Sequence, residues 1–225
     1  MGELAASIVH ELGNPLSVMS STLQFIYERL KKKGDDTSDE IEVVVDNLKR
    51  MDELLRGLSD FTTPEQEQFR FEHEDIHKAL SHVLTLVSRE ARKSNIEIKT
   101  DLAPNLPMCW HDPRRLKQVF LNLFKNAIEA MPYGGYLVVR TQFSPTESSD
   151  SRSNIIIEIS DTGIGISEEE LRLIFKPFYS TKKGGSGLGL PFCRRIVETH
   201  HGTITVKSVR EKGTTFTISM PLGRR

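Results

Sequence analysis

Residues 7–16 read Ser-Ile-Val-His-Glu-Leu-Gly-Asn-Pro-Leu and lie in a stretch whose apolar residues recur every three or four positions. This spacing is typical of an amphipathic α-helix, whose apolar seam would be formed by Leu4, Ile8, Leu12, Leu16, Met19, Leu23, Ile26 and Leu30. His10 lies about 200° around such a helix from Ile8 and from Leu12. The histidine is therefore predicted to face away from the seam.

Two polar residues accompany His10 on this helix. Glu11 is its neighbour, and Asn14 lies one turn further along the same side. Pro15 cannot donate a hydrogen bond to the carbonyl of Glu11, so a kink is expected just past the histidine. An exposed histidine beside a glutamate is most often a solvated pair, and only the rest of the chain favours a reactive site.

A second helix with the same apolar spacing follows a break at residues 34–38, which can end one helix and cap the next. Its apolar positions are Ile41, Val44, Val45, Leu48, Met51, Leu55, Leu58 and Phe61. Two long helices with a short connection predict an antiparallel hairpin. Because two helices enclose little core, we expect a homodimer that forms a four-helix bundle; packing on the rest of the same chain is the alternative.

The composition excludes some classes of partner. The 225 residues include 30 basic and 31 acidic side chains, so no net charge favours nucleic acid or an anionic membrane. Cys109 and Cys193 stand in mostly apolar surroundings and are interpreted as reduced core thiols of a cytoplasmic protein. No apolar run is long enough to span a membrane, so membrane attachment is expected only through a part that precedes residue 1.

A polar, aperiodic segment at residues 62–68 is typical of a linker and predicts domains at 1–64 and 65–225. The second domain mixes two kinds of periodicity. Strands are expected at 69–74, 96–102, 136–143, 154–160, 203–209 and 214–220, and helices at 75–93, 113–131 and 188–201. Helices on one face of a mostly antiparallel sheet would give an α+β sandwich.

The helix expected at 113–131 carries a polar stripe opposite its apolar face. Asn122 and Asn126 lie one turn apart in this stripe. An amide oxygen can bind Mg²⁺ without adding charge, which suits a metal already neutralised by phosphates. A solvated stripe is the alternative, but asparagine is a poor residue for a helix interior.

Three glycine-rich or aromatic loops follow. Asp161-Thr-Gly-Ile-Gly-Ile comes directly after an apolar strand, where a carboxylate can accept from the exocyclic amine of adenine. Residues 174–182 place aromatics in a polar loop, which is either pinned by them or closes over a ligand. Residues 184–190 lead into a helix, whose first N–H groups can bind an anion with help from Lys182 and Lys183.

In this order the motifs resemble those of the catalytic core of bacterial two-component sensor histidine kinases, over essentially the whole chain. Residues 10–16 resemble the H box, 122–127 the N box, 161–165 the G1 box, 175–178 the F box, 185–189 the G2 box and 213–216 the last glycine motif. Each motif alone is weak, but six in this order are specific. The Asn-Pro pair of the H box and residues 178–182 are most similar to the nitrogen-regulation branch.

The resemblance implies a dimerisation and phosphotransfer hairpin followed by an ATP-binding domain of the type shared with Hsp90, gyrase and MutL. His10 would attack the γ-phosphate of ATP and pass the phosphoryl group to an aspartate of a response regulator receiver domain. Glu11 would accept the imidazole proton. Asn14 would orient the water that dephosphorylates this partner.

The resemblance also implies the nucleotide contacts. Asp161 would bind adenine, and Asn126 would bind Mg²⁺ together with the ATP phosphates. The other implied contacts are Asn122, Lys125, Gly163, Gly165, Ile166, Phe178, Lys182, Gly185, Ser186, Gly187, Leu188, Gly189 and Thr215.

Two other classes share features with this pattern. Serine-phosphorylating kinases use the same ATP-binding fold but lack a hairpin centred on His10. A non-enzymatic scaffold gated by nucleotide is disfavoured because every motif side chain is present. The histidine pairs at 73/77 and 200/201 are interpreted as structural or solvated rather than as metal ligands.

Overall fold

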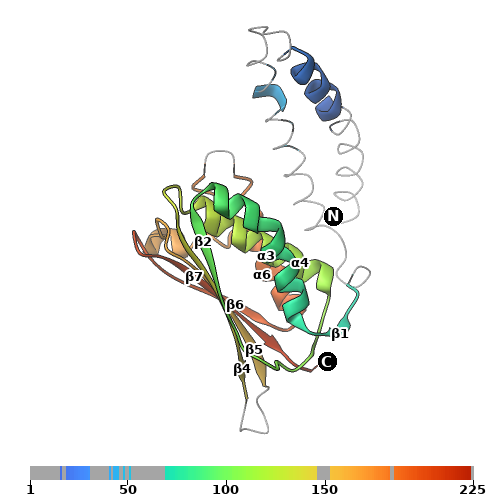
Figure 1. Ribbon diagram of the computed structural model, residues 1–225, viewed down its shortest axis with the longest axis vertical. Helices are drawn as coiled ribbons and strands as arrows, with labels where there is room; N and C mark the ends of the chain where they lie inside the picture. Colours follow the sequence, from blue (N-terminus) through green and yellow to red (C-terminus); the bar gives the residue numbers. More distant parts are fainter. Residues whose placement is uncertain are drawn as a thin grey trace. The chain divides into compact units, whose positions relative to one another are not determined.

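The computed structural model describes residues 16, 19–30, 41, 43–45, 48, 51, 69–145, 153–182 and 185–223 (Figure 1). The chain divides into two compact units, one of Met1–Glu65 with Pro177–Gly189 and one of Gln66–Lys176 with Leu190–Arg225. Each unit is described by itself. Among the described residues, no helix has both the length and the apolarity needed to cross a bilayer.

All described residues between 16 and 51 are helical, as the apolar spacing predicts. The described seam positions differ in burial. Leu16, Val45 and Leu48 are buried, whereas at least 37% of each of four others is exposed: Met19, Ile26, Val44 and Met51. The two helices therefore cover only part of their apolar seam within one chain.

The second unit is built on a five-stranded sheet in the order β2-β4-β5-β7-β6. The strands are β2 (Ile96–Leu102), β4 (Gly135–Ser144), β5 (Asn154–Asp161), β6 (Thr203–Val209) and β7 (Gly213–Pro221). Only the β2–β4 pairing is parallel, so the mostly antiparallel sheet is confirmed. β7 comes last of these strands in the chain, yet it lies between β5 and β6.

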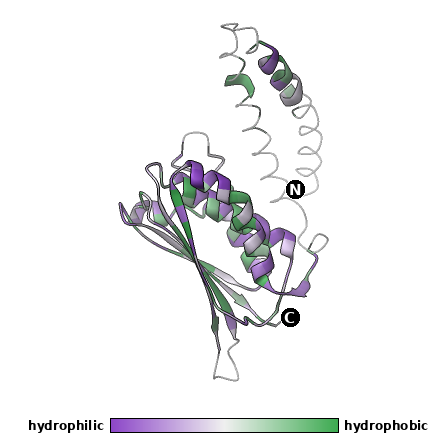
Figure 2. Cartoon of the chain, in the orientation of Figure 1, coloured by the Kyte–Doolittle hydropathy of each residue, from purple (hydrophilic) through white to green (hydrophobic). Residues whose placement is uncertain are grey.

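Three helices cover one face of this sheet: α3 (Ile76–Lys93), α4 (Pro113–Glu129) and α6 (Gly189–Thr199) (Figure 1). Asp75 and Asp112 cap α3 and α4 by accepting backbone N–H groups of the first turns. The core lies between the helices and the sheet. It contains the alternate isoleucines of β5 and the apolar positions predicted for the helix at 113–131, which are Leu116, Val119, Phe120, Leu123, Ala127 and Met131. Figure 2 shows hydrophobic and hydrophilic segments along the same helices. The α+β architecture is confirmed.

Three short elements were not predicted as the structure has them. β1 (Glu72–Glu74) is shorter than the strand expected at 69–74, and it pairs with the unpredicted β3 (Cys109–His111) as a separate two-stranded sheet. The one-turn helix α5 (Glu168–Leu171) begins with a capping box between Ser167 and Glu170. The spacing Ser-x-x-Glu was the signal for α5, whereas three residues are too few to show a strand period.

The chain enters this unit at a corner formed by His200. The rings of Phe69 and Phe71 pack on the imidazole, with centroids 5.7 and 4.9 Å away. Nε2 of His200 accepts the N–H of Asp112 at 2.9 Å, and Nδ1 lies 2.7 Å from the carbonyl oxygen of Ile196. Nδ1 therefore carries the hydrogen, and the ring is neutral. Burial lowers the pKa of His200 below its ordinary value.

Candidate functional site

Asp161 ends β5 with its side chain directed into the helix-covered side of the sheet. The residue is 8% exposed. Oδ1 accepts the backbone N–H of Gly163 at 2.9 Å and that of Thr214, on the neighbouring strand β7, at 3.3 Å. These two bonds fix the carboxylate as a hydrogen-bond acceptor at the end of a buried strand.

The loop after Asp161 is fastened on two sides. The N–H of Ile164 donates to the carbonyl of Ala130, just past the end of α4, at 3.0 Å. Gly163 approaches Ala130 so closely that a Cβ atom at this position would collide with the Ala130 backbone. On the other side, the N–H of Glu211 in the β6–β7 turn donates to Ile164 O at 2.7 Å. The loop thus joins the end of α4 to the β6–β7 turn.

The polar stripe of α4 is not simply solvated. Asn122 and Asn126 are half-buried, whereas Lys125 is exposed. The thiol of Cys193 on α6 donates to the carbonyl of Val119 on α4 at 3.8 Å, and the side chain of Asn122 lies close enough to lower the pKa of this thiol. Burial raises the pKa of this thiol to about 12, against a smaller lowering by the Asn122 side chain, so Cys193 is a protonated core residue.

The two threonines at the start of β7 face opposite sides of the sheet. Thr214 is paired with Asp161 in the β5–β7 register and is 4% exposed. Thr215 lies on the open face, where its hydroxyl is 2.9 Å from that of Ser160. The predicted nucleotide contact Thr215 thus lies on the opposite face, and the threonine that pairs with Asp161 is Thr214. Strand alternation could have found it only with the register known.

The other compact unit holds the loop that follows the F box. The N–H of Phe178 donates to Gly187 O at 3.0 Å, and both residues have positive φ, 65° and 67°. A Cβ atom added to Gly187 would lie 2.5 Å from the carbonyl carbon of Phe178. Only glycine therefore fits at this position. The side chain of Phe178 is 65% exposed.

The other residues of this loop that were predicted to contact the nucleotide are Lys182, Gly185, Ser186, Leu188 and Gly189. The N–H of Gly185 donates to Lys182 O at 3.2 Å, and the N–H of Leu188 lies 3.4 Å from the hydroxyl of Ser186. Leu188 is buried, and Gly189 begins α6. The predicted loop-to-helix junction is therefore present.

Phe175 anchors the F box within the sheet unit. The guanidinium of Arg194, on α6, lies 3.8 Å from the centroid of the Phe175 ring. A cation this close to an aromatic face is attracted to it. This contact supports the interpretation of Phe175 as an aromatic anchor.

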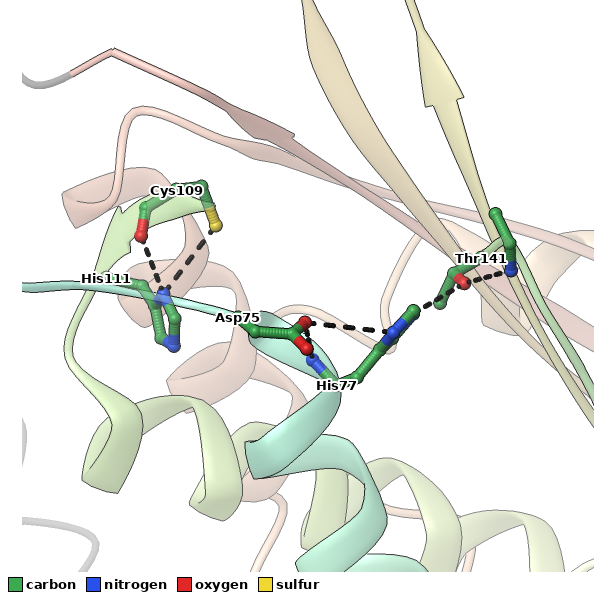
Figure 3. Close-up of polar contacts among 6 residues, drawn as sticks. Asp75, His77, Cys109, His111 and Thr141 are labelled. Atoms are coloured by element: carbon green, nitrogen blue, oxygen red, sulfur yellow. Dashed lines mark hydrogen bonds and ion pairs between the residues drawn. The ribbon is translucent and has the colours of Figure 1, made fainter. Parts of the chain in front are cut away.

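The histidines of the β1–α3 junction do not converge on a metal. The ring of His73 packs on Trp110, with centroids 5.3 Å apart. Nε2 of His77 lies 2.9 Å from the hydroxyl of Thr141, as Figure 3 shows. In the described part of the chain, no group of three His, Cys, Asp or Glu side chains could hold a metal ion.

His10, Glu11 and Asn14 lie outside the described residues. Their roles, which come from the H-box resemblance, stay predictions.

Two family profiles match the chain. Residues 111–224 match the family described as "Histidine kinase-, DNA gyrase B-, and HSP90-like ATPase". Residues 1–67 match the "His Kinase A (phospho-acceptor) domain". Between the two matches lie residues 68–110, which include α3 and β2.

Individual proteins show the same similarity. "Sporulation kinase C" of Bacillus subtilis (strain 168) is 37% identical over 221 residues, which are 98% of this chain and 49% of that protein. The chain spans between 29% and 49% of the length of the first curated relatives it matches.

Solved structures are similar over the whole chain. The structure of full-length ShkA in complex with AMPPNP covers 100% of this chain and 47% of the ShkA chain, with a TM-score of 0.79. At 22% sequence identity, this similarity shows a shared fold and no more. Histidine kinase ThkA in complex with response regulator protein TrrA matches 99% of this chain and 62% of its own, with a TM-score of 0.68 at 26% identity.

Proposed function

The chain belongs to the sensor histidine kinases, of which it is the catalytic core, and from this premise we propose that it transfers the γ-phosphoryl group of ATP to His10. The proposed division of labour follows the predicted domains. Residues 1–64 carry the phosphorylated histidine and residues 65–225 bind the nucleotide.

The observation that carries the proposal is the carboxylate of Asp161. It is nearly buried, it is held by two backbone N–H groups, and it lies beside a loop whose glycine permits close backbone packing. A fixed anionic acceptor suits the 6-amino group of adenine and repels the 6-carbonyl of guanine. ATP is therefore the nucleotide that this site favours.

Asn122 and Asn126 support binding of the ATP phosphates with Mg²⁺. Their neutral amides are half-buried on α4, and the amide oxygen of Asn126 is a hard donor that fits Mg²⁺. Bound there, Mg²⁺ would neutralise developing charge on the phosphates. Lys125, exposed on the same helix, would add positive charge.

The remaining nucleotide contacts are proposed from the glycine motifs. Gly163, Gly165 and Ile166 form the loop after Asp161, which packs against the end of α4 and the β6–β7 turn. Phe178, Lys182 and residues 185–189 are proposed to contact the nucleotide from the second glycine loop. Thr215 is the contact predicted from the last glycine motif; we propose Thr214 in its place, because Thr214 is the threonine that pairs with Asp161 in the register of β7 on β5.

For the chemistry, the imidazole of His10 attacks the γ-phosphorus in line, the bond from the γ-phosphorus to the β–γ bridging oxygen breaks, and ADP leaves, while Glu11 accepts the imidazole proton. The phosphoryl group then passes to a receiver aspartate of a response regulator. ThkA, a similar kinase, was solved in complex with such a regulator. Hydrolysis of the receiver phosphate with water oriented by Asn14 is a second proposed activity, and assignment to the nitrogen-regulation branch stays a prediction.

A homodimer is proposed through the hairpin. Met19, Ile26, Val44 and Met51 occupy predicted seam positions and are exposed in a single chain. A twofold partner would bury these side chains in a four-helix bundle.

The test is incubation with γ-labelled ATP and Mg²⁺, followed by mapping of the labelled residue. Label on His10 that is lost in acid and kept in base is expected. Label that survives acid and maps to serine would instead support a serine kinase of the same ATP fold. Binding of ATP without incorporation of label would support a nucleotide-gated scaffold.

A further inference from the structure

Ser208 lies outside every motif discussed above, yet it continues a row of polar residues that starts at Asp161. In the sheet register, Asp161 of β5 pairs with Thr214 of β7, and Thr214 pairs with Ser208 of β6. Asp161 and Thr214 are buried, and Ser208 is half-buried. The three side chains therefore lie side by side across three neighbouring strands.

The hydroxyl of Ser208 makes three hydrogen bonds. It accepts the backbone N–H of Ile166 at 2.8 Å and donates to the carbonyl of Gly213 at 2.9 Å. Its third partner is the hydroxyl of Thr214, with the two oxygens 3.0 Å apart. A hydroxyl has one hydrogen, and that of Ser208 is used by Gly213, so Thr214 is the donor in the third bond.

The direction of that bond determines what Thr214 presents beside Asp161. With its hydrogen directed at Ser208, Oγ1 of Thr214 offers only lone pairs elsewhere. Oγ1 and the carboxylate of Asp161 are then two neighbouring acceptors. Such a pair favours a base that carries an amino group, and a threonine free to rotate would lose part of this preference.

The bond to Ile166 has a second effect on the same site. Ile166 ends the glycine loop whose other end starts at Asp161. Because Ser208 accepts the Ile166 N–H, this end of the loop is fixed to the edge strand β6. The same hydroxyl thus orients Thr214 and holds the loop.

We infer that Ser208 is a positioning residue for adenine recognition, acting through Thr214 and the loop that ends at Ile166. Ser208 itself need not touch the nucleotide. The inference rests on the proposed function, because it requires that the adenine amine faces Asp161.

The test compares the affinity for ATP with that for purine riboside 5′-triphosphate, which lacks the 6-amino group. Wild-type protein prefers ATP. In Ser208→Ala, Thr214 can turn its hydrogen toward the base, and the preference for ATP falls about threefold to tenfold, the effect of one neutral hydrogen bond. Ser208→Thr keeps a hydroxyl on Cβ and restores the preference.

A matched control is Ser219→Ala. Ser219 also lies in the β6–β7 pair but on the opposite face from the row, between the buried Ile218 and Met220. This variant keeps the wild-type preference. Thermal unfolding of each variant without nucleotide is measured in parallel.

An unchanged preference in Ser208→Ala, with or without a lower Tm, would make Ser208 a structural residue and overturn the inference. If wild-type protein binds ATP and the analogue equally well, Asp161 does not bind the 6-amino group of adenine. The inference would then fail together with that part of the proposed function. If Ser208→Ala does not fold, Ser208→Cys, which keeps the volume but bonds weakly, is measured by the same criterion.

Discussion

The backbone N–H of Asp112 donates to Nε2 of His200 at 2.9 Å and joins the start of α4 to the end of α6. The bond requires a neutral imidazole, because a protonated Nε2 would direct a hydrogen at the Asp112 N–H. Asp112 also accepts the N–H of Arg70 through Oδ2 at 2.9 Å, so the same aspartate binds the segment that enters the domain. This corner depends on the charge state of one histidine.

The first prediction concerns acid stability. Burial lowers the pKa of His200 in the folded state below its ordinary value of 6.5, so the unfolded chain binds this proton more strongly. The free energy of unfolding therefore falls as the pH falls below about 6.5. Each 1 kcal/mol lost lowers Tm by about 2–4 °C for a chain of this size.

The measurement is Tm at about pH 7.5 and about pH 5.5. His200→Gln, which keeps an acceptor and a donor, should show a smaller drop than wild type. It will not abolish the drop, since burial also lowers the pKa of His111. His82→Gln, on the exposed side of α3, is the control. A drop equal to that of wild type in His200→Gln would show that this histidine does not carry the pH dependence.

The second prediction separates the two threonines of β7. Thr214→Val removes the hydroxyl beside Asp161 and should weaken ATP binding about threefold to tenfold. Thr215→Val removes the hydroxyl bonded to Ser160 on the open face and should leave the affinity unchanged. Calorimetric titration with ATP measures both. Weaker ATP binding in Thr215→Val, with unchanged binding in Thr214→Val, would instead identify Thr215 as the nucleotide contact.

The third prediction concerns Asp161→Asn. The amide keeps one oxygen for the N–H groups of Gly163 and Thr214 but replaces the other oxygen with a donor. A hydrogen bond to a charged group is worth about 1.5–3 kcal/mol, so we expect a loss of ATP affinity of roughly tenfold or more. Asp101→Asn, whose side chain is 79% exposed on β2, should have no effect. Equal affinities in all three proteins would move the adenine site elsewhere.

The fourth prediction separates two activities on the first helix. Asn14→Ala, which helix propensity favours, should keep autophosphorylation but lose the ability to accelerate decay of a labelled receiver protein in the presence of ADP. Its counterpart, His10→Gln, should lose incorporation of label while keeping ATP affinity. Undiminished receiver decay with Asn14→Ala would assign this residue to helix structure alone.

Periodicity predicted the long elements because their burial repeats many times. Every predicted apolar position on the face of α4 is buried, and β5 alternates as expected. β3 was missed because three residues show no period, and it is held by pairing with β1 rather than by its own sequence. The parallel β2–β4 pairing was not predicted, because strand order depends on contacts distant in sequence.

For the candidate site, the sequence alone predicts where Asp161 lies, because a charged residue directly follows an apolar strand. It does not show that Thr214 is the threonine paired with Asp161, because choosing between two adjacent threonines needs the register of β7 on β5. Ser208 could not be found either, since its partners Ile166 and Gly213 come together only when the β6–β7 turn meets the glycine loop.

The central place of β7 also constrains the order of events during synthesis. β5 leaves the ribosome more than fifty residues before β7, and until β7 emerges both β5 and β6 present open edges. If translation pauses before residue 213, β5 and β6 of the nascent chain lack the strand that lies between them, and Asp161 lacks its pairing partner Thr214. The proposed adenine site is therefore completed only by the last strand of the sheet to be made.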